Sequence, residues 1–139
     1  MIDKLNVRVY ATIVKENKVL VLHEEYAGEQ LVKFPGGGLE LGEGLIDCVQ
    51  REIEEELNVK IRIKDHLYTQ DHFVASRFRE NEQLLTIYYD VEMMNEEDFL
   101  MLDPCIERIE WLSLDVQDNP FKLPVDQIVF EKLKQKYLP

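Results

Sequence analysis

The sequence has few cysteines, few basic residues for its acidity, and no long apolar run. Its 139 residues include two cysteines, and 16 lysines and arginines stand against 28 aspartates and glutamates, a formal net charge of -12. Two thiols form no disulfide framework and are typical of a reducing compartment, so we expect a cytoplasmic protein. An acidic field of this size repels phosphate backbones and anionic lipids, so duplex nucleic acid and membranes are not expected partners.

The lack of long apolar segments excludes further classes. No run approaches the ~18 apolar residues that a membrane-spanning helix needs. The first residues, Met1 to Asn6, carry charges with no long apolar stretch after them, which is unlike a signal peptide. Hydrophobic residues make up 45% of the chain, and its length fits one domain over residues 1–139 with a core that needs no disulfides.

Hydrophobic periodicity predicts a mixture of strands and helices. Stretches rich in β-branched and aromatic residues are typical of strands, and apolar residues at helical spacing are typical of helices. Strands are expected over residues 7–14, 18–22, 30–34, 59–63, 84–93 and 107–114, and helices over 45–57 and 125–137. The polar segment 15–17 ends in Asn17, which tolerates a positive φ, so the first two strands should form a hairpin. This order indicates α/β or α+β layers.

A glycine-rich segment directly precedes the first expected helix. Four of the six glycines lie between Gly36 and Gly42, and three of them, Gly36 to Gly38, are consecutive. Backbone without Cβ atoms allows a ligand to approach closely. A structural turn alone rarely needs three glycines in succession, so this run predicts a ligand-binding loop.

The helix expected over 45–57 has an apolar face and an acidic face. At about 100° per residue, the apolar stripe consists of Ile46, Val49, Ile53 and Leu57. Glu52, Glu55 and Glu56 share the adjoining face, where like charges at these spacings destabilise a helix by a few tenths of a kcal/mol per pair. A hard cation such as Mg²⁺ or Mn²⁺ removes this repulsion. Solvated glutamate-rich helices are also common, which leaves a merely exposed acidic face as the alternative.

These residues together resemble the Nudix box, G-x5-E-x7-R-E-U-x-E-E-x-G-U, where U is a bulky aliphatic residue. Its fixed positions are occupied by Gly37, Glu43, Arg51, Glu52, Ile53, Glu55, Glu56 and Val59. The preceding Pro35-Gly36 also fits the family pattern. One position departs, because Asn58 replaces the glycine that ends the helix, and asparagine is the next best residue for a left-handed helix end.

The resemblance implies both a fold and an activity. The fold is the Nudix-type α/β/α sandwich with a mixed β-sheet. The activity is hydrolysis of a pyrophosphate bond in a nucleoside diphosphate linked to another moiety, with nucleoside triphosphates among the candidate substrates. Relatives often pair, so a homodimer is one expectation.

The resemblance also assigns roles to individual residues. Glu52, Glu55 and Glu56 are expected to bind Mg²⁺ or Mn²⁺, with the Gly36 carbonyl as a further ligand. Glu43 and Arg51 should fix the loop against the helix. The expected substrate-binding residues are Gly37, Gly38 and Lys33. Two alternatives stay open: a catalytically inactive nucleotide-binding or regulatory module of the same fold, and a carboxylate cluster that holds a structural cation.

Overall fold

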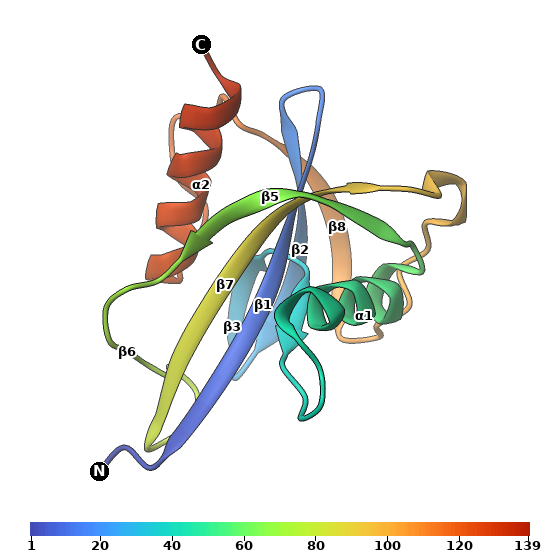
Figure 1. Cartoon of the computed structure of the whole chain (residues 1–139). Coiled ribbons are helices and arrows are strands. Elements are labelled where there is room, and N and C mark those ends of the chain that lie inside the picture. The colour runs from blue at the N-terminus through green and yellow to red at the C-terminus, as the bar shows by residue number, and fades with distance from the viewer.

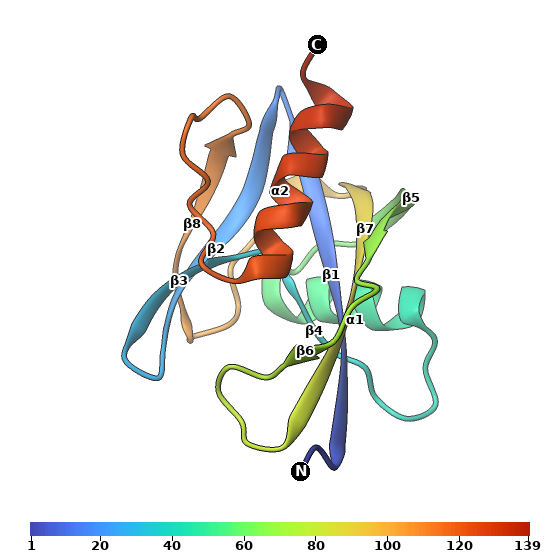
Figure 2. The same ribbon diagram turned by 90° about the vertical axis from the view of Figure 1, so that its left-hand side faces the viewer.

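The central strand, β1 (Lys4–Lys15), has apolar side chains on both faces because helices cover both. In the computed structural model of residues 1–139, Val9, Ala11 and Ile13 belong to one buried cluster, which includes the apolar side of α1 (Leu45–Leu57). Tyr10 and Val14 pack against a second cluster, which contains the buried side of α2 (Pro124–Tyr137). The two helices therefore lie on opposite sides of the sheet, as Figures 1 and 2 show.

The sheet is mixed, as expected. The other strands are β2 (Lys18–Tyr26), β3 (Glu29–Lys33), β4 (Gly36–Gly38), β5 (Ile61–Thr69), β6 (Val74–Ala75), β7 (Glu82–Met93) and β8 (Ile106–Ser113). The order is β3-β2-β1-β7-β5, with β4 on β1, β6 on β7 and β8 on β2. β1 and β7 pair in parallel, and all other pairs are antiparallel. The predicted α/β/α layering is confirmed.

All expected strands and helices are present, and two short strands were not expected. The turn 15–17 connects β1 to β2, with Asn17 at φ 60°. The strand expected over 59–63 lies instead over Ile61–Thr69. β4 escaped prediction because a glycine run has no side-chain pattern, and β6 is only two residues long. A Cβ on Gly36 would lie 2.2 Å from the Val9 carbonyl oxygen, so only glycine permits this close pairing.

The apolar face of α1 differs from the predicted one at its first turn. Val49, Ile53 and Leu57 are buried as expected, but Ile46 is 44% exposed. The helix instead buries Cys48 and Glu56, because this side faces the glycine loop and the Cys48 thiol lies 3.8 Å from the Gly37 carbonyl oxygen. The helix ends as predicted at Asn58, which has φ 59° and donates its backbone N–H to the Glu54 carbonyl at 3.0 Å.

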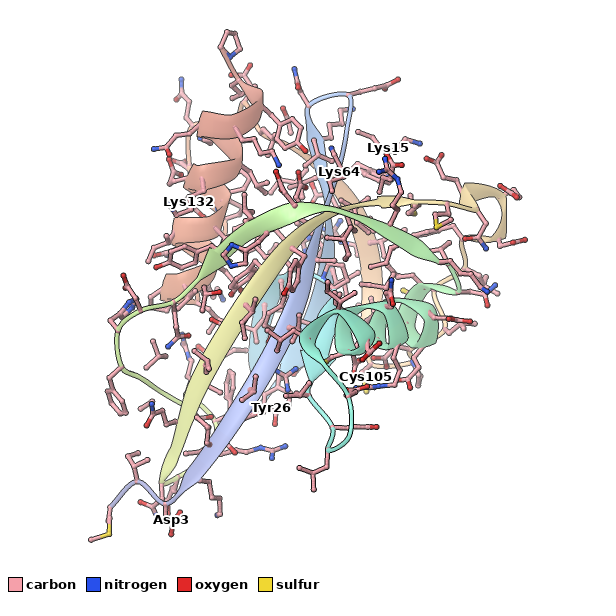
Figure 3. The ribbon with its side chains drawn as sticks, viewed as in Figure 1. Asp3, Lys15, Tyr26, Lys64, Cys105 and Lys132 are labelled. Atoms are coloured by element: carbon pink, nitrogen blue, oxygen red, sulfur yellow. The ribbon has the colours of Figure 1, made fainter.

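A buried carboxylate anchors the end of α2 on the far side of the sheet. Asp90 of β7 has no exposed surface and accepts hydrogen bonds from Thr12 at 2.8 Å and from Lys136 at 2.7 Å, and Tyr137 also donates to it. Lys64 of β5, labelled in Figure 3, donates to the Tyr137 hydroxyl at 2.8 Å. The helix C-terminus is thus fixed by charge as well as by apolar packing.

No helix is both long and apolar enough to cross a membrane.

Candidate active site

The glycine loop and α1 are joined by a buried carboxylate. Glu56 is 6% exposed, and its Oε1 accepts the backbone N–H of Gly36 at 2.9 Å. Burial raises the pKa of Glu56 to about 7, although the Gly36 N–H and the charge of Lys33 favour the ionised form. The side chain therefore lies between ionised and neutral near physiological pH, which is typical of functional carboxyl groups.

Glu52 lies directly beneath the same loop. A Cβ built on Gly37 would lie 2.3 Å from the Glu52 Cδ and 2.4 Å from its Oε2. No other residue type leaves room for this carboxylate, because non-bonded heavy atoms need about 3.5–4.0 Å. The glycine run thus serves the approach of a protein carboxylate as well as the pairing of β4 with β1.

Arg51 connects the loop to the acidic face. Its guanidinium donates to both oxygens of Glu43, from Nε at 3.0 Å and from Nη2 at 2.7 Å, and to the Gly38 carbonyl at 3.0 Å. These bonds, with one from the Glu40 backbone N–H, lower the pKa of Glu43 to about 2. Arg51 Nη1 also contacts Glu52 at 2.9 Å and Glu55 at 3.3 Å. The expected loop-fixing pair is therefore in contact.

The expected metal ligands do not form a closed site. No three His, Cys, Asp or Glu side chains stand close enough together to hold a metal ion. Glu52 and Glu56 both reach the loop, whereas Glu55 is 59% exposed and turns toward Arg51. The charges of the site nevertheless fit a hard cation. Arg51 supplies one positive charge to the three carboxylates of Glu43, Glu52 and Glu55, so negative charge remains for a cation to balance. The exposed Glu55 can rotate toward the loop without unfolding the helix.

Lys33 lies beside the site but is already paired. Its ammonium group forms an ion pair with Glu24 of the neighbouring strand. Burial alone would lower the pKa of Lys33, but this bond and the charges of Glu24 and Glu56 raise it above its ordinary value. The structure thus places Lys33, which was expected to bind substrate, near Glu56, but its ammonium group is already bound to Glu24.

Sequence reasoning missed a pocket that is lined by Tyr10, the strand partner of Gly36. It measures about 430 Å³, and its walls include Tyr10, Tyr88, Leu123 and Asp126. Asp126 is 4% exposed and accepts the Tyr88 hydroxyl at 2.6 Å, and burial raises its pKa to about 6. The sequence carries only a weak signal for a role of Asp126 in a pocket, since an aspartate in the first turn of a helix usually stabilises the helix dipole.

Family comparison agrees with this geometry. The NUDIX domain family matches residues 4–131, so the chain belongs to the Nudix family. It is thus a hydrolase of the class that acts on pyrophosphate bonds, as predicted. No curated protein matches the chain by sequence.

Solved structures show the same fold at low sequence identity. A MutT NUDIX hydrolase from Burkholderia pseudomallei is 23% identical with a TM-score of 0.77, covering 94% of this chain and 98% of its own. The MutT protein of Methanosarcina mazei Go1 is 19% identical with a TM-score of 0.76, covering 100% and 99%. An ADP-ribose pyrophosphatase from Streptococcus suis is 17% identical with a TM-score of 0.63, covering 95% and 92%. The predicted Nudix-type fold is confirmed.

Proposed function

We propose that this protein, acting as one domain over residues 1–139, hydrolyses the pyrophosphate bond of a nucleotide whose diphosphate carries a further group. The observation that carries the proposal is the convergence of Glu52 and Glu56 on the glycine loop, where Gly36 binds one carboxylate and Gly37 leaves room for the other. A carboxylate cluster that served stability alone would not need glycines where Glu52 and Glu56 reach the loop. This favours a site that is open to a ligand.

Each group of the expected set has a role in the proposal. Glu52, Glu55 and Glu56 would hold Mg²⁺ or Mn²⁺, with the Gly36 carbonyl as a further ligand, and the bound cation would neutralise the diphosphate and activate a water molecule. Arg51 keeps Glu43 and the Gly38 carbonyl in contact with α1, so that the loop is bonded directly to the helix. Gly37 and Gly38 offer backbone to the substrate, and placement of the reacting groups supplies much of the rate.

The pocket lined by Tyr10 and Asp126 is the proposed position of the nucleoside. Tyr10 and Tyr88 are stacked there with ring centroids 5.3 Å apart, so the wall is aromatic and rigid. Asp126 is the one carboxyl group at the pocket, and it has acceptor capacity left after its bond to Tyr88. Lys33 is close enough to both Asp126 and Glu56 for its charge to lower the pKa of each. A nucleotide in this position would extend its phosphates toward the glycine loop.

The test is a substrate panel with matched variants. Nucleoside triphosphates, a nucleotide sugar, ADP-ribose and a dinucleoside polyphosphate are incubated with Mg²⁺ or Mn²⁺, and release of phosphate, pyrophosphate or nucleotide is measured. Glu55→Gln and Glu56→Gln should lower kcat by roughly 100-fold or more with the fold intact. Glu54→Gln is the control, since Glu54 lies on the same helix and is exposed.

Two results would contradict the proposal. One is turnover by Glu55→Gln and Glu56→Gln that matches the Glu54→Gln control. The other is tight nucleotide binding by the wild-type protein without product from any substrate in the panel, which would favour the inactive binding module.

A further inference from the structure

Arg8 is a half-buried arginine that lacks a carboxylate partner. The other half-buried arginine, Arg51, lies within 4.0 Å of four carboxylates, whereas Arg8 forms no ion pair in a chain with 28 acidic residues. Its single side-chain hydrogen bond runs from Nε to the Tyr10 hydroxyl, at 2.7 Å. The two terminal amino groups have no protein acceptor. No buried side-chain nitrogen lacks a partner, so these two amino groups reach solvent and are free to bind a ligand.

The position of Arg8 links the two halves of the proposed site. Arg8 and Tyr10 share one face of β1, because alternate residues of a strand point the same way. Arg8 is the strand partner of Gly38, and its Nη1 lies 3.8 Å from the point where a Cβ of Gly38 would be. Tyr10, which holds the Nε, lines the pocket. The free end of Arg8 therefore lies between the pocket and the glycine loop.

Electrostatics agrees with this position. Burial by itself lowers the pKa of Arg8, and Tyr10, Glu52 and Glu56 raise it above its ordinary value, so Glu52 and Glu56 act on the guanidinium without contacting it. Lys33 is paired with Glu24, and Arg77, a cation that lines the pocket, is paired with Glu29. Among the cations beside the glycine loop, Arg8 is thus the one whose donors are not already used by the protein.

We propose that Arg8 binds the phosphate group attached to the nucleoside, through its two terminal amino groups, while the Tyr10 hydroxyl fixes the guanidinium plane. This inference rests on the proposed function, since it assumes a nucleotide that spans from the pocket to the glycine loop. A planar guanidinium offers two parallel donors that match two phosphate oxygens, which an ammonium group does not. Arg8 would therefore distinguish a nucleotide from a nucleoside and set its register along the site.

The experiment measures binding without catalysis. Dissociation constants of adenosine, AMP, guanosine and GMP are determined by NMR titration in EDTA, and the quantity compared is the ratio of the nucleoside Kd to the monophosphate Kd. Arg8→Gln should lower this ratio by about 10- to 100-fold, and Arg8→Lys should restore part of it. Arg62→Gln is the control, because Arg62 is exposed and pairs with Glu92 away from the loop.

Tyr10→Phe separates positioning from folding. It keeps the aromatic ring that stacks on Tyr88 but removes the oxygen that holds Arg8 Nε, so the ratio should fall by a smaller factor than in Arg8→Gln. If Arg8→Gln does not fold, Arg8→Lys and Tyr10→Phe decide the question.

The inference is overturned if the ratio in the folded Arg8 variants stays within twofold of wild type, or if the wild-type protein shows no preference for the monophosphates. These outcomes are distinct from failure of the proposed function. Monophosphates contain no anhydride bond, so turnover on the substrate panel is scored independently of these constants.

Discussion

Gly37→Ala tests the close approach of the loop to the acidic face of α1. The added Cβ would lie 2.3 Å from the Glu52 Cδ, where about 3.5 Å is needed, so the carboxylate must move by more than about 1 Å. The φ of Gly37 lies outside the left-handed region, so the backbone itself tolerates alanine. A displacement of about 1 Å at a catalytic group costs roughly 100-fold in rate. Because the far end of Glu52 is flexible, the stability loss should stay near 1 kcal/mol, at the low end for overpacking.

The assay compares Gly37→Ala with Gly44→Ala in kcat/KM and in thermal melting. Gly44 is the N-cap of α1 with φ -84°, and its added Cβ would lie 3.4 Å from Asp47 Oδ2, which is an ordinary contact. Gly44→Ala should therefore retain kcat/KM within about twofold. Equal kcat/KM for the two variants, or an unmoved Glu52 in a structure of Gly37→Ala, would refute the reasoning.

Three further predictions concern charge. Arg51→Lys loses the two-pronged bond to Glu43 and should lower kcat/KM by about 10- to 100-fold with a lower melting temperature, whereas an unchanged rate would contradict the loop-fixing role. Asp126 has its pKa raised by burial from 3.8 to about 6, so it favours folding when protonated; wild type should lose about 2 kcal/mol of unfolding free energy relative to Asp126→Asn between pH 4 and 6, and parallel pH profiles would refute this. Asp90→Ala should cost roughly 3–5 kcal/mol in urea denaturation, against under about 1 kcal/mol for the exposed Asp65→Ala, and equal losses would contradict the buried anchor.

Local patterns were enough to predict α1 and its acidic face. The 3.6-residue period places Glu52 and Glu56 beside Ile53 without any tertiary information, and the box pairs Glu43 with Arg51 across the loop. Ile46 was assigned wrongly to the core because periodicity does not show which end of a helix extends past the sheet.

The remaining features depend on contacts between distant segments. The backbone pairing of β4 with β1 has no side-chain pattern that a sequence could display. A single cation in an apolar strand, such as Arg8, is indistinguishable in sequence from a solvent-facing residue. The pocket lies among β1, β7 and the start of α2, so the place of Asp126 in its wall can be seen only when these elements are packed together.

The parallel pairing of β1 with β7 has a consequence for how the chain is made. Partners such as Lys4 and Glu82 lie far apart in sequence, and the glycine loop and α1 are synthesised between them. Until residue 93 has left the ribosome, β1 has an unpaired edge, and unpaired edges recruit other strands. The glycine loop and α1 are therefore translated before the strand that completes their support, and their final arrangement has to wait for a slow, long-range closure.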